Sequence, residues 1–336
     1  MNSNQQIVIS QHGAPEVLEL MAQTSREPKP GEVKVKVVAA GVAYADVMAQ
    51  RGGYPIAPKP PFTPGYDFAG VVEQVGEGVS GFAKGDHVLG LNPVMGCYAQ
   101  QLCISAQYLV PYPSHLPPEK VCSLVLNYLT AYCLLHKKTQ MKAGQTLLVH
   151  SAAGGVGSAL LQLAALAGIK VFGTASAGKL ELVRKLGATP IDYQKADFVE
   201  EIREQCPLGV DVAVDPFGGD NLRRSYQSVR RGGQLVSYGF AGKHFGGLKP
   251  MLSGLAQLTW LRLLPDGRKV DFCALPAEAK KDPLWYRQAL AELIDLLVEG
   301  KIDPIIGEVV PLQEASKAHT LIERGAVTGK VILQCA

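Results

Sequence analysis

Residues 147–157, with the sequence LLVHSAAGGVG, are the segment whose residue types and spacing point most directly to chemistry. An apolar run ends in a turn of small residues, and a second apolar run opens directly after it. In a strand–turn–helix unit, Gly154 would let backbone N–H groups approach a pyrophosphate, and Gly157 would let the helix pack closely on the strand. Ala152 occupies the first glycine position of the G-x-G-x-x-G pattern, so the strict pattern is broken there. The turn predicts dinucleotide binding; the alternative is a structural turn of an unrelated α/β protein.

The segment that follows the next predicted strand, residues 173–179, contains no acidic residue. A site that prefers NAD presents a carboxylate to the ribose 2′-hydroxyl at about this distance along the chain, roughly 20 residues on. A carboxylate would repel the 2′-phosphate of NADP, whereas Ser176 can donate a hydrogen bond and Lys179 supplies a positive charge. The segment therefore favours NADPH over NADH. The alternative is that Lys179 is an ordinary solvated residue in the first turn of a helix.

Length and charge set the class of protein that must position these residues. At about 150 residues per domain, 336 residues predict two domains. The 33 basic and 30 acidic residues leave a net charge of +3, which is too small and too dispersed for nucleic-acid binding. We therefore expect a small-molecule substrate and no nucleic-acid partner.

Cysteine usage and hydropathy favour a cytoplasmic protein. The seven cysteines are scattered, odd in number and free of any CxxC pair, which argues against a disulfide framework and against a four-cysteine zinc site. The first residues lack the basic and apolar regions of a signal peptide. The uncharged stretch 121–135 is too short to span a membrane, and 143–169 is interrupted by glycines. We expect no membrane partner.

The first third of the chain reads as β-structure. Val33, Val35 and Val37 alternate with charged residues, which is the period-2 pattern of a half-buried strand. Further short apolar runs at 68–75, 87–90 and 98–104 are bounded by glycine and proline. This part of the chain predicts a partly open antiparallel barrel or a sandwich.

From about residue 118 the pattern changes to alternating strands and helices. A helix is predicted over 119–135, and Pro118 suits its first turn. Gly187 suits the end of another predicted helix, 179–186. The predicted strands are 146–149, 171–174, 191–193, 210–214, 235–238 and 270–274. The predicted helices between them include 156–167, 179–186, 198–205 and 221–229. This alternation indicates a doubly wound parallel sheet.

The tail returns to the style of the N-terminal part. Helices are predicted over 284–299 and 314–324, and strands over 309–310 and 330–333. We expect this tail to complete the N-terminal domain. The predicted domains are then 1–124 with 278–336, and an inserted nucleotide-binding domain over 125–277. For the segment 243–268, which carries Trp260 and Arg262, three tasks remain open: covering a cleft, making dimer contacts, or packing.

Three motifs together resemble the medium-chain dehydrogenase/reductase superfamily over essentially the whole chain. They are residues 41–46 (GVAYAD), 64–70 (PGYDFAG) and the glycine turn at 154–157. The resemblance implies a GroES-like partly open β-barrel catalytic domain and a Rossmann cofactor domain with a doubly wound parallel sheet, an α/β fold.

The resemblance also tests for catalytic zinc, which three protein ligands would hold. Zinc-dependent members carry a cysteine at the position of Ala43, a His-Glu pair at Tyr66 and Asp67, and a second cysteine at Leu126. All these ligand types are replaced, and the cysteine cluster of the structural zinc is missing as well. We therefore expect a zinc-independent enzyme without a metal.

The match narrows to quinone oxidoreductases, zeta-crystallin-like proteins and enoyl or alkenal reductases. Residues 52–55 (GGYP), 129–132 (LTAY), 237–239 (SYG) and 329–331 (GKV) resemble motifs of this branch. The resemblance places Thr130 by the nicotinamide and Tyr193 near the adenosine. The full set of predicted cofactor residues is Thr130, Ala153, Gly154, Gly155, Val156, Gly157, Thr174, Ser176, Lys179, Tyr193, Phe217, Tyr238, Gly239 and Phe240. Family resemblance also suggests a homodimer joined by edge strands near 270–274.

The acceptor pocket departs from the branch. Quinone reductases usually have asparagine at Ala43, and often tyrosine and arginine at Met48 and Gln50. The polar residues that remain nearby, and our candidate catalytic residues, are Tyr44, Tyr54 and Asp46. A tyrosine hydroxyl can donate to the oxygen of a developing enolate or phenolate. The structural alternatives are helix packing for Tyr44, a pocket rim for Tyr54, and capping or pairing for Asp46.

These residues predict an NADPH-dependent, zinc-independent reductase that transfers hydride to a quinone or to an α,β-unsaturated carbonyl (an enone, enal or enoyl group). It would be an NADPH:quinone oxidoreductase or an enoyl or alkenal reductase. A dedicated acyl or polyketide substrate and a broad quinone substrate fit the same residues. The rival from another class is a nucleotide-binding, zeta-crystallin-like protein with a structural or RNA-associated role and little turnover.

Overall fold

The computed structural model describes residues 3–54, 56–241 and 249–335. Pro55, in the predicted GGYP motif, and residues 243–248 of the segment 243–268 lie outside the described residues. The chain divides into two compact units. The first unit is Met1–Leu129 with Pro276–Ala336, and the second unit is Thr130–Leu275. Each is described separately.

The first unit is built on a seven-stranded sheet in the order β14-β15-β3-β4-β5-β7, with β6 pairing β3. Its strands are β3 (Glu32–Val42), β4 (Asp67–Val75), β5 (His87–Leu91), β6 (Gln101–Ser105), β7 (Leu109–Pro111), β14 (Ile306–Pro311) and β15 (Lys330–Gln334). The valines of the alternating pattern in β3 are fully buried. The β-rich structure predicted for this part of the chain is therefore confirmed.

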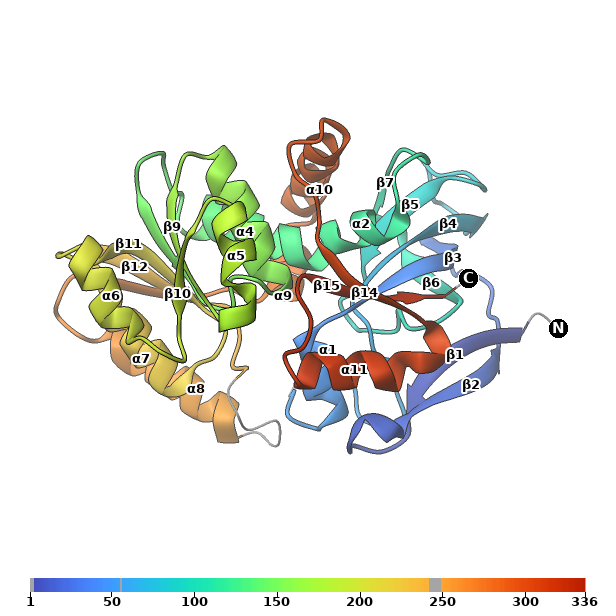
Figure 1. Ribbon diagram of the computed structural model, residues 1–336. Coiled ribbons are helices and arrows are strands. Elements are labelled where there is room, and N and C mark those ends of the chain that lie inside the picture. The colour runs from blue at the N-terminus through green and yellow to red at the C-terminus, as the bar shows by residue number, and fades with distance from the viewer. Residues whose placement is uncertain (1–2, 55, 242–248, 336) are drawn as a thin grey trace. The chain divides into compact units, whose positions relative to one another are not determined.

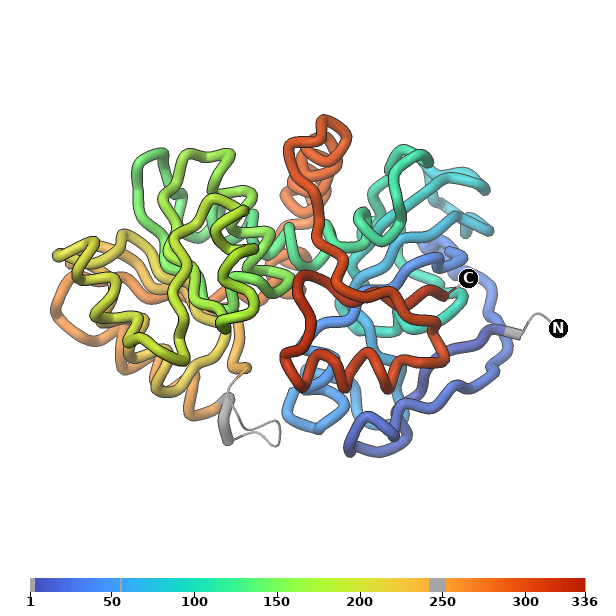
Figure 2. The backbone as a smooth tube through the Cα atoms, in the orientation of Figure 1, coloured from blue at the N-terminus to red at the C-terminus, as the bar shows by residue number. Residues whose placement is uncertain are grey.

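The C-terminal tail lies within this first sheet. Strand β15 pairs antiparallel with β3, with Leu333 opposite Ala40, and pairs parallel with β14. Figure 2 shows the red end of the chain running beside the blue strand of the N-terminal part. Helices α10 (Pro283–Val298) and α11 (Ala315–Glu323) precede these strands, each within two residues of its predicted bounds.

A hairpin of β1 (Ser3–Ile9) and β2 (Leu18–Thr24) adds a two-stranded sheet that the sequence pattern did not reveal. Ile7 and Ile9 of β1 are fully buried, but β2 is almost entirely exposed, so it carries no strong alternation. Helix α1 (Tyr44–Gln50) follows β3 directly.

The second unit contains a six-stranded parallel sheet in the order β10-β9-β8-β11-β12-β13. Its strands are β8 (Thr146–Val149), β9 (Lys170–Ala175), β10 (Thr189–Asp192), β11 (Val210–Asp215), β12 (Val229–Ser237) and β13 (Lys269–Phe272). All six were predicted, and the doubly wound sheet is confirmed. The strand order reverses between β8 and β11, and such a switch point is where doubly wound sheets bind ligands.

Helices cover both faces of this sheet (Figure 1). Helices α4 (Gly155–Leu166) and α5 (Leu180–Lys185) lie on one face, and α6 (Phe198–Gln205), α7 (Gly219–Ser228) and α8 (Lys249–Arg262) lie on the other. Neighbouring residues of β9 show the division. Phe172 joins a core cluster with residues of α6, α7 and α8, whereas Gly173 faces Val183 of α5.

The predicted helix 119–135 is a longer helical run with two π-helical segments. It consists of α2 (Pro118–Ser123), the π-helical η3 (Leu124–Tyr128), α3 (Leu129–Tyr132) and the π-helical η4 (Cys133–Lys138). The predicted LTAY motif forms α3 and is flanked by both π segments, which often occur at functional sites. The remaining helices are η1 (Pro15–Val17), η2 (Ala106–Tyr108), η5 (Ala177–Lys179), α9 (Leu275–Lys281) and η6 (Leu312–Glu314).

Candidate functional site

The glycine turn joins β8 to α4 through tight backbone contacts. Ser151 adopts a left-handed conformation with φ of 52°, and its carbonyl oxygen accepts a hydrogen bond from the Gly154 N–H at 2.8 Å. A Cβ added to Gly154 would come within 2.9 Å of the Ser151 hydroxyl oxygen. A Cβ added to Gly157 would collide with the Ser151 carbonyl oxygen. Gly157 therefore requires glycine to close the turn, whereas a side chain at Gly154 would first have to displace the Ser151 hydroxyl.

Gly173 explains how alanine is accommodated at the first glycine position. Ala152 is fully buried, and its N–H donates to the Thr174 carbonyl oxygen at 3.0 Å. A Cβ at Gly173 would lie 2.8 Å from the Cβ of Ala152. The missing side chain in β9 thus makes room for the alanine methyl in the turn. The local backbone tolerates this departure from the strict pattern.

The first turn of α4 fits a pyrophosphate. Gly154 is the N-cap residue and has no side chain with which to cap the helix. The N–H groups of Gly155, Val156 and Gly157 are first-turn donors, which lack carbonyl partners within a helix. They and the helix dipole favour an anion. Ala153, with Gly154, forms the part of the turn just before these donors. The predicted residues thus form a bare backbone cradle that a dinucleotide would fit.

The segment after β9 brings together the residues predicted to read the 2′-phosphate. Ser176 is the N-cap of η5, and its carbonyl oxygen accepts from the Lys179 N–H at 2.9 Å. Both side chains are partly exposed. Partial burial lowers the pKa of the Lys179 ammonium. Tyr193, just after β10, is 55% exposed, so its ring is accessible to a ligand.

The loops after β11 and β12 are held together. Phe217 follows β11, and its N–H donates to Oδ1 of Asp215 at 2.7 Å. Tyr238, Gly239 and Phe240 follow β12. A Cβ at Gly239 would lie 2.9 Å from the carbonyl oxygen of Pro216, in the neighbouring loop. The Phe240 ring stacks on Phe272 with centroids 5.4 Å apart. These loops therefore form one packed layer at the carboxyl edge of the sheet.

The two threonines among the predicted cofactor residues are buried. Thr174 is 2% exposed, and its hydroxyl lies 3.0 Å from Nδ1 of His150. Its side chain points into the unit, so a direct contact between its hydroxyl and a cofactor does not fit this geometry. The sequence could not show this, because a threonine at the end of a strand can point either towards a ligand or into the protein interior. Thr130 of α3 is also buried.

Asp46 lies at the third position of α1 and is completely buried. Its Oδ2 accepts from the Ala43 N–H at 2.9 Å, and its Oδ1 accepts from the Gly65 N–H at 3.0 Å. Burial raises the pKa of this carboxyl to about 7, the negative charge of Asp67 adds to the rise, and the two N–H groups oppose it. Asp46 thus joins the start of α1 to the turn before β4. This arrangement matches the capping alternative rather than a base facing substrate.

Three further buried polar residues extend from Asp46, and the sequence pattern did not reveal them. The Tyr98 hydroxyl lies 3.3 Å from Oδ2 of Asp46 and 3.2 Å from Nε2 of His319. Nδ1 of His319 lies 2.6 Å from Oε1 of Gln50. Burial lowers the pKa of His319 to about 3, so the ring is neutral. The cluster ties α1 to α11.

Tyr44 and Tyr54 are both partly exposed in the first unit. Tyr44 is the first residue of α1, and burial raises the pKa of its phenol to about 12. Burial also raises the pKa of Tyr54, whose ring meets the Tyr66 ring edge-on at a centroid distance of 6.3 Å. Each hydroxyl therefore carries its proton at neutral pH.

The positions that hold zinc ligands in other enzymes have a different chemistry here. Ala43 is the N-cap of α1, Tyr66 is buried, and Leu126 is apolar. Asp67 is buried with its Oδ2 2.7 Å from Nζ of Lys330. Within the described ranges, no three His, Cys, Asp or Glu side chains come together as a metal site.

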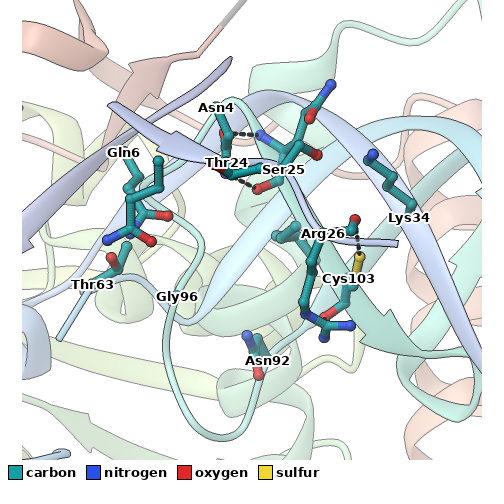
Figure 3. A pocket seen from close by; sticks show the side chains of 13 residues that line it. Asn4, Gln6, Thr24, Ser25, Arg26, Lys34, Thr63, Asn92, Gly96 and Cys103 are labelled. Atoms are coloured by element: carbon teal, nitrogen blue, oxygen red, sulfur yellow. Dashed lines mark hydrogen bonds between the residues drawn. The ribbon is translucent and has the colours of Figure 1, made fainter. Parts of the chain in front are cut away.

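The first unit also contains a polar pocket of about 280 Å³ (Figure 3). Most of its lining is amide or hydroxyl side chains, including Asn4, Thr63 and Asn92. Its two cationic side chains are neutralised: Arg26 pairs with Glu32, and Lys34 lies 3.7 Å from Glu27. None of the residues predicted to act in catalysis lines it, and its charge balance gives no reason to bind an anion.

Two family models match the chain. Residues 29–114 match the alcohol dehydrogenase GroES-like domain, and residues 186–333 match zinc-binding dehydrogenase. A quinone oxidoreductase of Sus scrofa is 30% identical, over 97% of this chain and 96% of the relative. The chain belongs to the medium-chain dehydrogenase/reductase superfamily, in its quinone oxidoreductase branch. This membership confirms the resemblance drawn from the sequence motifs.

Two further relatives illustrate the range of this superfamily. The synaptic vesicle membrane protein VAT-1 homolog of Homo sapiens is 35% identical, over 97% of this chain and 85% of the relative. The crystal structure of the Escherichia coli quinone oxidoreductase, complexed with NADPH, has a TM-score of 0.89 and 30% identity. That similarity covers 98% of this chain and 99% of the other.

Among the described residues of this member of the superfamily, no helix has the length and apolarity to cross a membrane.

Proposed function

We propose that this chain is an NADPH-dependent reductase that delivers hydride to a quinone or to an α,β-unsaturated carbonyl. The observation that carries the proposal is the bare glycine turn at the switch point of the second sheet, followed by an acid-free segment with Ser176 and Lys179. The quinone oxidoreductase relatives support the same reading.

In this proposal the carboxyl edge of the second sheet holds the cofactor. First-turn N–H groups of α4, from Gly155 to Gly157, bind the pyrophosphate. Ser176 and Lys179 bind the 2′-phosphate, and the exposed Tyr193 ring packs near the adenosine. Phe217, Tyr238, Gly239 and Phe240 border the cofactor from the loops after β11 and β12, and Thr130 lies towards the nicotinamide. When bound, NADPH supplies the hydride.

The first unit supplies the residues that act on the acceptor. Tyr44 and Tyr54 are protonated phenols that donate hydrogen bonds to the acceptor oxygen as negative charge develops on it. Asp46 is a positioning residue in this proposal. Its two oxygens accept from the backbone N–H groups of Ala43 and Gly65, and this pairing fixes the start of α1, where Tyr44 lies. Acceptors that place charge on an oxygen need no stronger acid, since solvent can protonate the product.

The test compares NADPH oxidation with a small quinone and a small enone, with NADH as the control cofactor. Turnover that prefers NADPH supports the enzyme, and the faster acceptor identifies the substrate class. Tight NADPH binding without turnover of either acceptor leaves two readings, a dedicated acyl substrate or the non-catalytic role. Tyr44→Phe and Tyr54→Phe should each lower kcat without changing NADPH binding. Failure of the wild-type protein to bind NADPH would overturn the proposal.

We also propose a cytoplasmic homodimer. All seven cysteines are free thiols, as in proteins of reducing compartments. Strand β13 is an edge of the second sheet, the neighbouring helix α8 exposes Leu255 and Trp260, and Leu263 directly after the helix is exposed as well. A strand at the edge of a sheet beside exposed apolar side chains favours association with a second copy. Sedimentation equilibrium should give twice the chain mass, and a monomer at micromolar concentration would contradict this part of the proposal.

A further inference from the structure

A chain of four buried polar side chains crosses the second unit just below the carboxyl edge of its sheet. Oδ2 of Asp215 lies 2.7 Å from the Ser225 hydroxyl, which lies 2.9 Å from Nε2 of His150. Nδ1 of His150 lies 3.0 Å from the Thr174 hydroxyl. None of the four is more than 2% exposed. Such buried polar groups are costly unless every member is paired.

The direction of each hydrogen bond in this chain can be assigned. The single proton of the Ser225 hydroxyl goes to the Asp215 carboxylate or to the Asn221 carbonyl oxygen, 2.8 Å away. Towards His150 the hydroxyl can therefore only accept, so Nε2 of His150 donates. Burial lowers the pKa of His150 to about 4, so the ring is neutral and its Nδ1 accepts. The Thr174 hydroxyl must then donate to Nδ1.

Three members of this chain lie next to residues that we assign to the cofactor. His150 directly precedes the glycine turn at 151–157, and Thr174 lies two residues before Ser176. Asp215 uses its other oxygen, Oδ1, to accept from the N–H groups of Phe217 and Gly218, at 2.7 and 2.8 Å. The four side chains thus connect the ends of β8, β9 and β11.

The structure assigns His150, with Thr174 and Ser225, as positioning residues that hold the three cofactor loops in the arrangement that binds NADPH. The assignment rests on the proposed function, because it concerns the same cofactor. The ring is well suited to this task, since it spans from β9 to α7 with one donor and one acceptor in fixed directions. An apolar residue in its place would remove the acceptor of the Thr174 hydroxyl and the donor to the Ser225 hydroxyl.

Two substitutions remove single polar groups from the chain. Thr174→Val replaces the donating hydroxyl with a methyl group, and Ser225→Ala removes the central hydroxyl. We expect each to raise the Kd for NADPH roughly tenfold, in line with the loss of a buried hydrogen bond. The kcat at saturating NADPH should change less than about twofold, because no member of the chain reaches the acceptor.

Matched controls separate positioning from a general loss of stability. Ser228→Ala removes another fully buried hydroxyl of α7, one that donates only to the Arg224 carbonyl oxygen of its own helix. Thr174→Ser keeps the donor. His150→Gln keeps one donor and one acceptor, whereas His150→Leu keeps neither. We expect Ser228→Ala and Thr174→Ser to bind NADPH like the wild type, and His150→Gln to bind more tightly than His150→Leu.

The measurement is a fluorescence titration of each variant with NADPH at 20 °C, after circular dichroism has shown that the variant is folded. If His150→Leu does not fold, the Thr174 and Ser225 variants still decide the question. Wild-type binding together with equal Kd values for Ser225→Ala, Thr174→Val and Ser228→Ala would overturn the positioning role. Failure of the wild type itself to bind would instead refute the proposed function.

Discussion

Nζ of Lys330 lies 2.7 Å from Oδ2 of Asp67, and both side chains are closed off from solvent. The pair joins β15 of the tail to β4, across β3, which pairs with both strands. Gly41 of β3 makes this possible, because a Cβ there would collide with both side chains. Oδ1 of Asp67 has no hydrogen-bond partner within the described residues. The pair therefore consists of one short contact between opposite charges, supplemented by the Cys122 thiol, which lies 3.9 Å from the same oxygen of Asp67.

Removal of one charge should destabilise the first unit more than removal of both. Lys330→Met leaves Asp67 buried without a counter-charge, which should lower the free energy of unfolding by about 3–5 kcal/mol. Lys330→Met combined with Asp67→Asn should recover most of that loss. Urea unfolding of the two single variants and the double variant completes the cycle. Additive losses in the double variant would contradict the coupling.

Asp46 should make the stability of the first unit depend on pH. Its pKa in the folded protein is about 7, above the value of about 4 in an unfolded chain. Between these values the folded state keeps a proton that the unfolded state releases. The free energy of unfolding should therefore fall as pH rises from about 4 to 7, by about 1.4 kcal/mol for each pH unit within that window. Asp46→Asn has no proton to lose and should show a flatter profile.

Urea unfolding midpoints of wild type and Asp46→Asn, measured at pH 5 and pH 8, test this dependence. The wild-type midpoint should drop more between the two pH values than that of the variant. The comparison between the two proteins cancels the other titrating groups, which both share. Parallel profiles would show that Asp46 is ionised at both pH values.

Gly157 should tolerate no side chain. A Cβ there would collide with the Ser151 carbonyl oxygen and lie 2.8 Å from Cα of Ala152. We expect Gly157→Ala to displace the turn from α4, to cost about 1–3 kcal/mol and to weaken NADPH binding. Gly178→Ala is the matched control for stability, because a Cβ at Gly178 meets no atom within 4 Å. Thermal unfolding of both variants and NADPH titration of Gly157→Ala check this, and equal thermal stability of the two variants would refute the close-packing role.

The sequence was sufficient for the elements whose signal is local. Most β-strands of the second unit contain short apolar runs, and all six were predicted, although β12 begins six residues before its predicted start at residue 235. The glycine turn was predicted for the same reason, because the spacing of the glycines within residues 151–157 is itself a local signal for a tight turn between a strand and a helix. Strand β2 was not predicted, because its side chains are mostly exposed and the strand is held by its backbone pairing with β1.

Contacts between distant polar residues could not be predicted in this way. Asp46, Tyr98 and His319 come from three separate parts of the first unit, and each alone resembles an ordinary polar residue of a helix or loop. The same holds for His150 and Ser225, whose pairing depends on how α7 lies on the sheet. Only the folded chain brings such groups together, because burial and pairing are properties of the tertiary arrangement.

Reversal of the charge at Lys179 should change the choice of cofactor. Lys179→Glu places a carboxylate beside Ser176, where it would repel a 2′-phosphate and accept from a 2′-hydroxyl. We expect the KM for NADPH to rise by about tenfold or more, and the KM for NADH to fall or stay the same. Lys170→Glu makes the same charge change at the exposed first residue of β9, at the opposite end of the strand, and should leave both values unchanged. Steady-state kinetics with each cofactor decide this. A similar rise of the KM for NADPH in both variants would show that Lys179 acts only through the net charge of the protein and does not contact the 2′-phosphate.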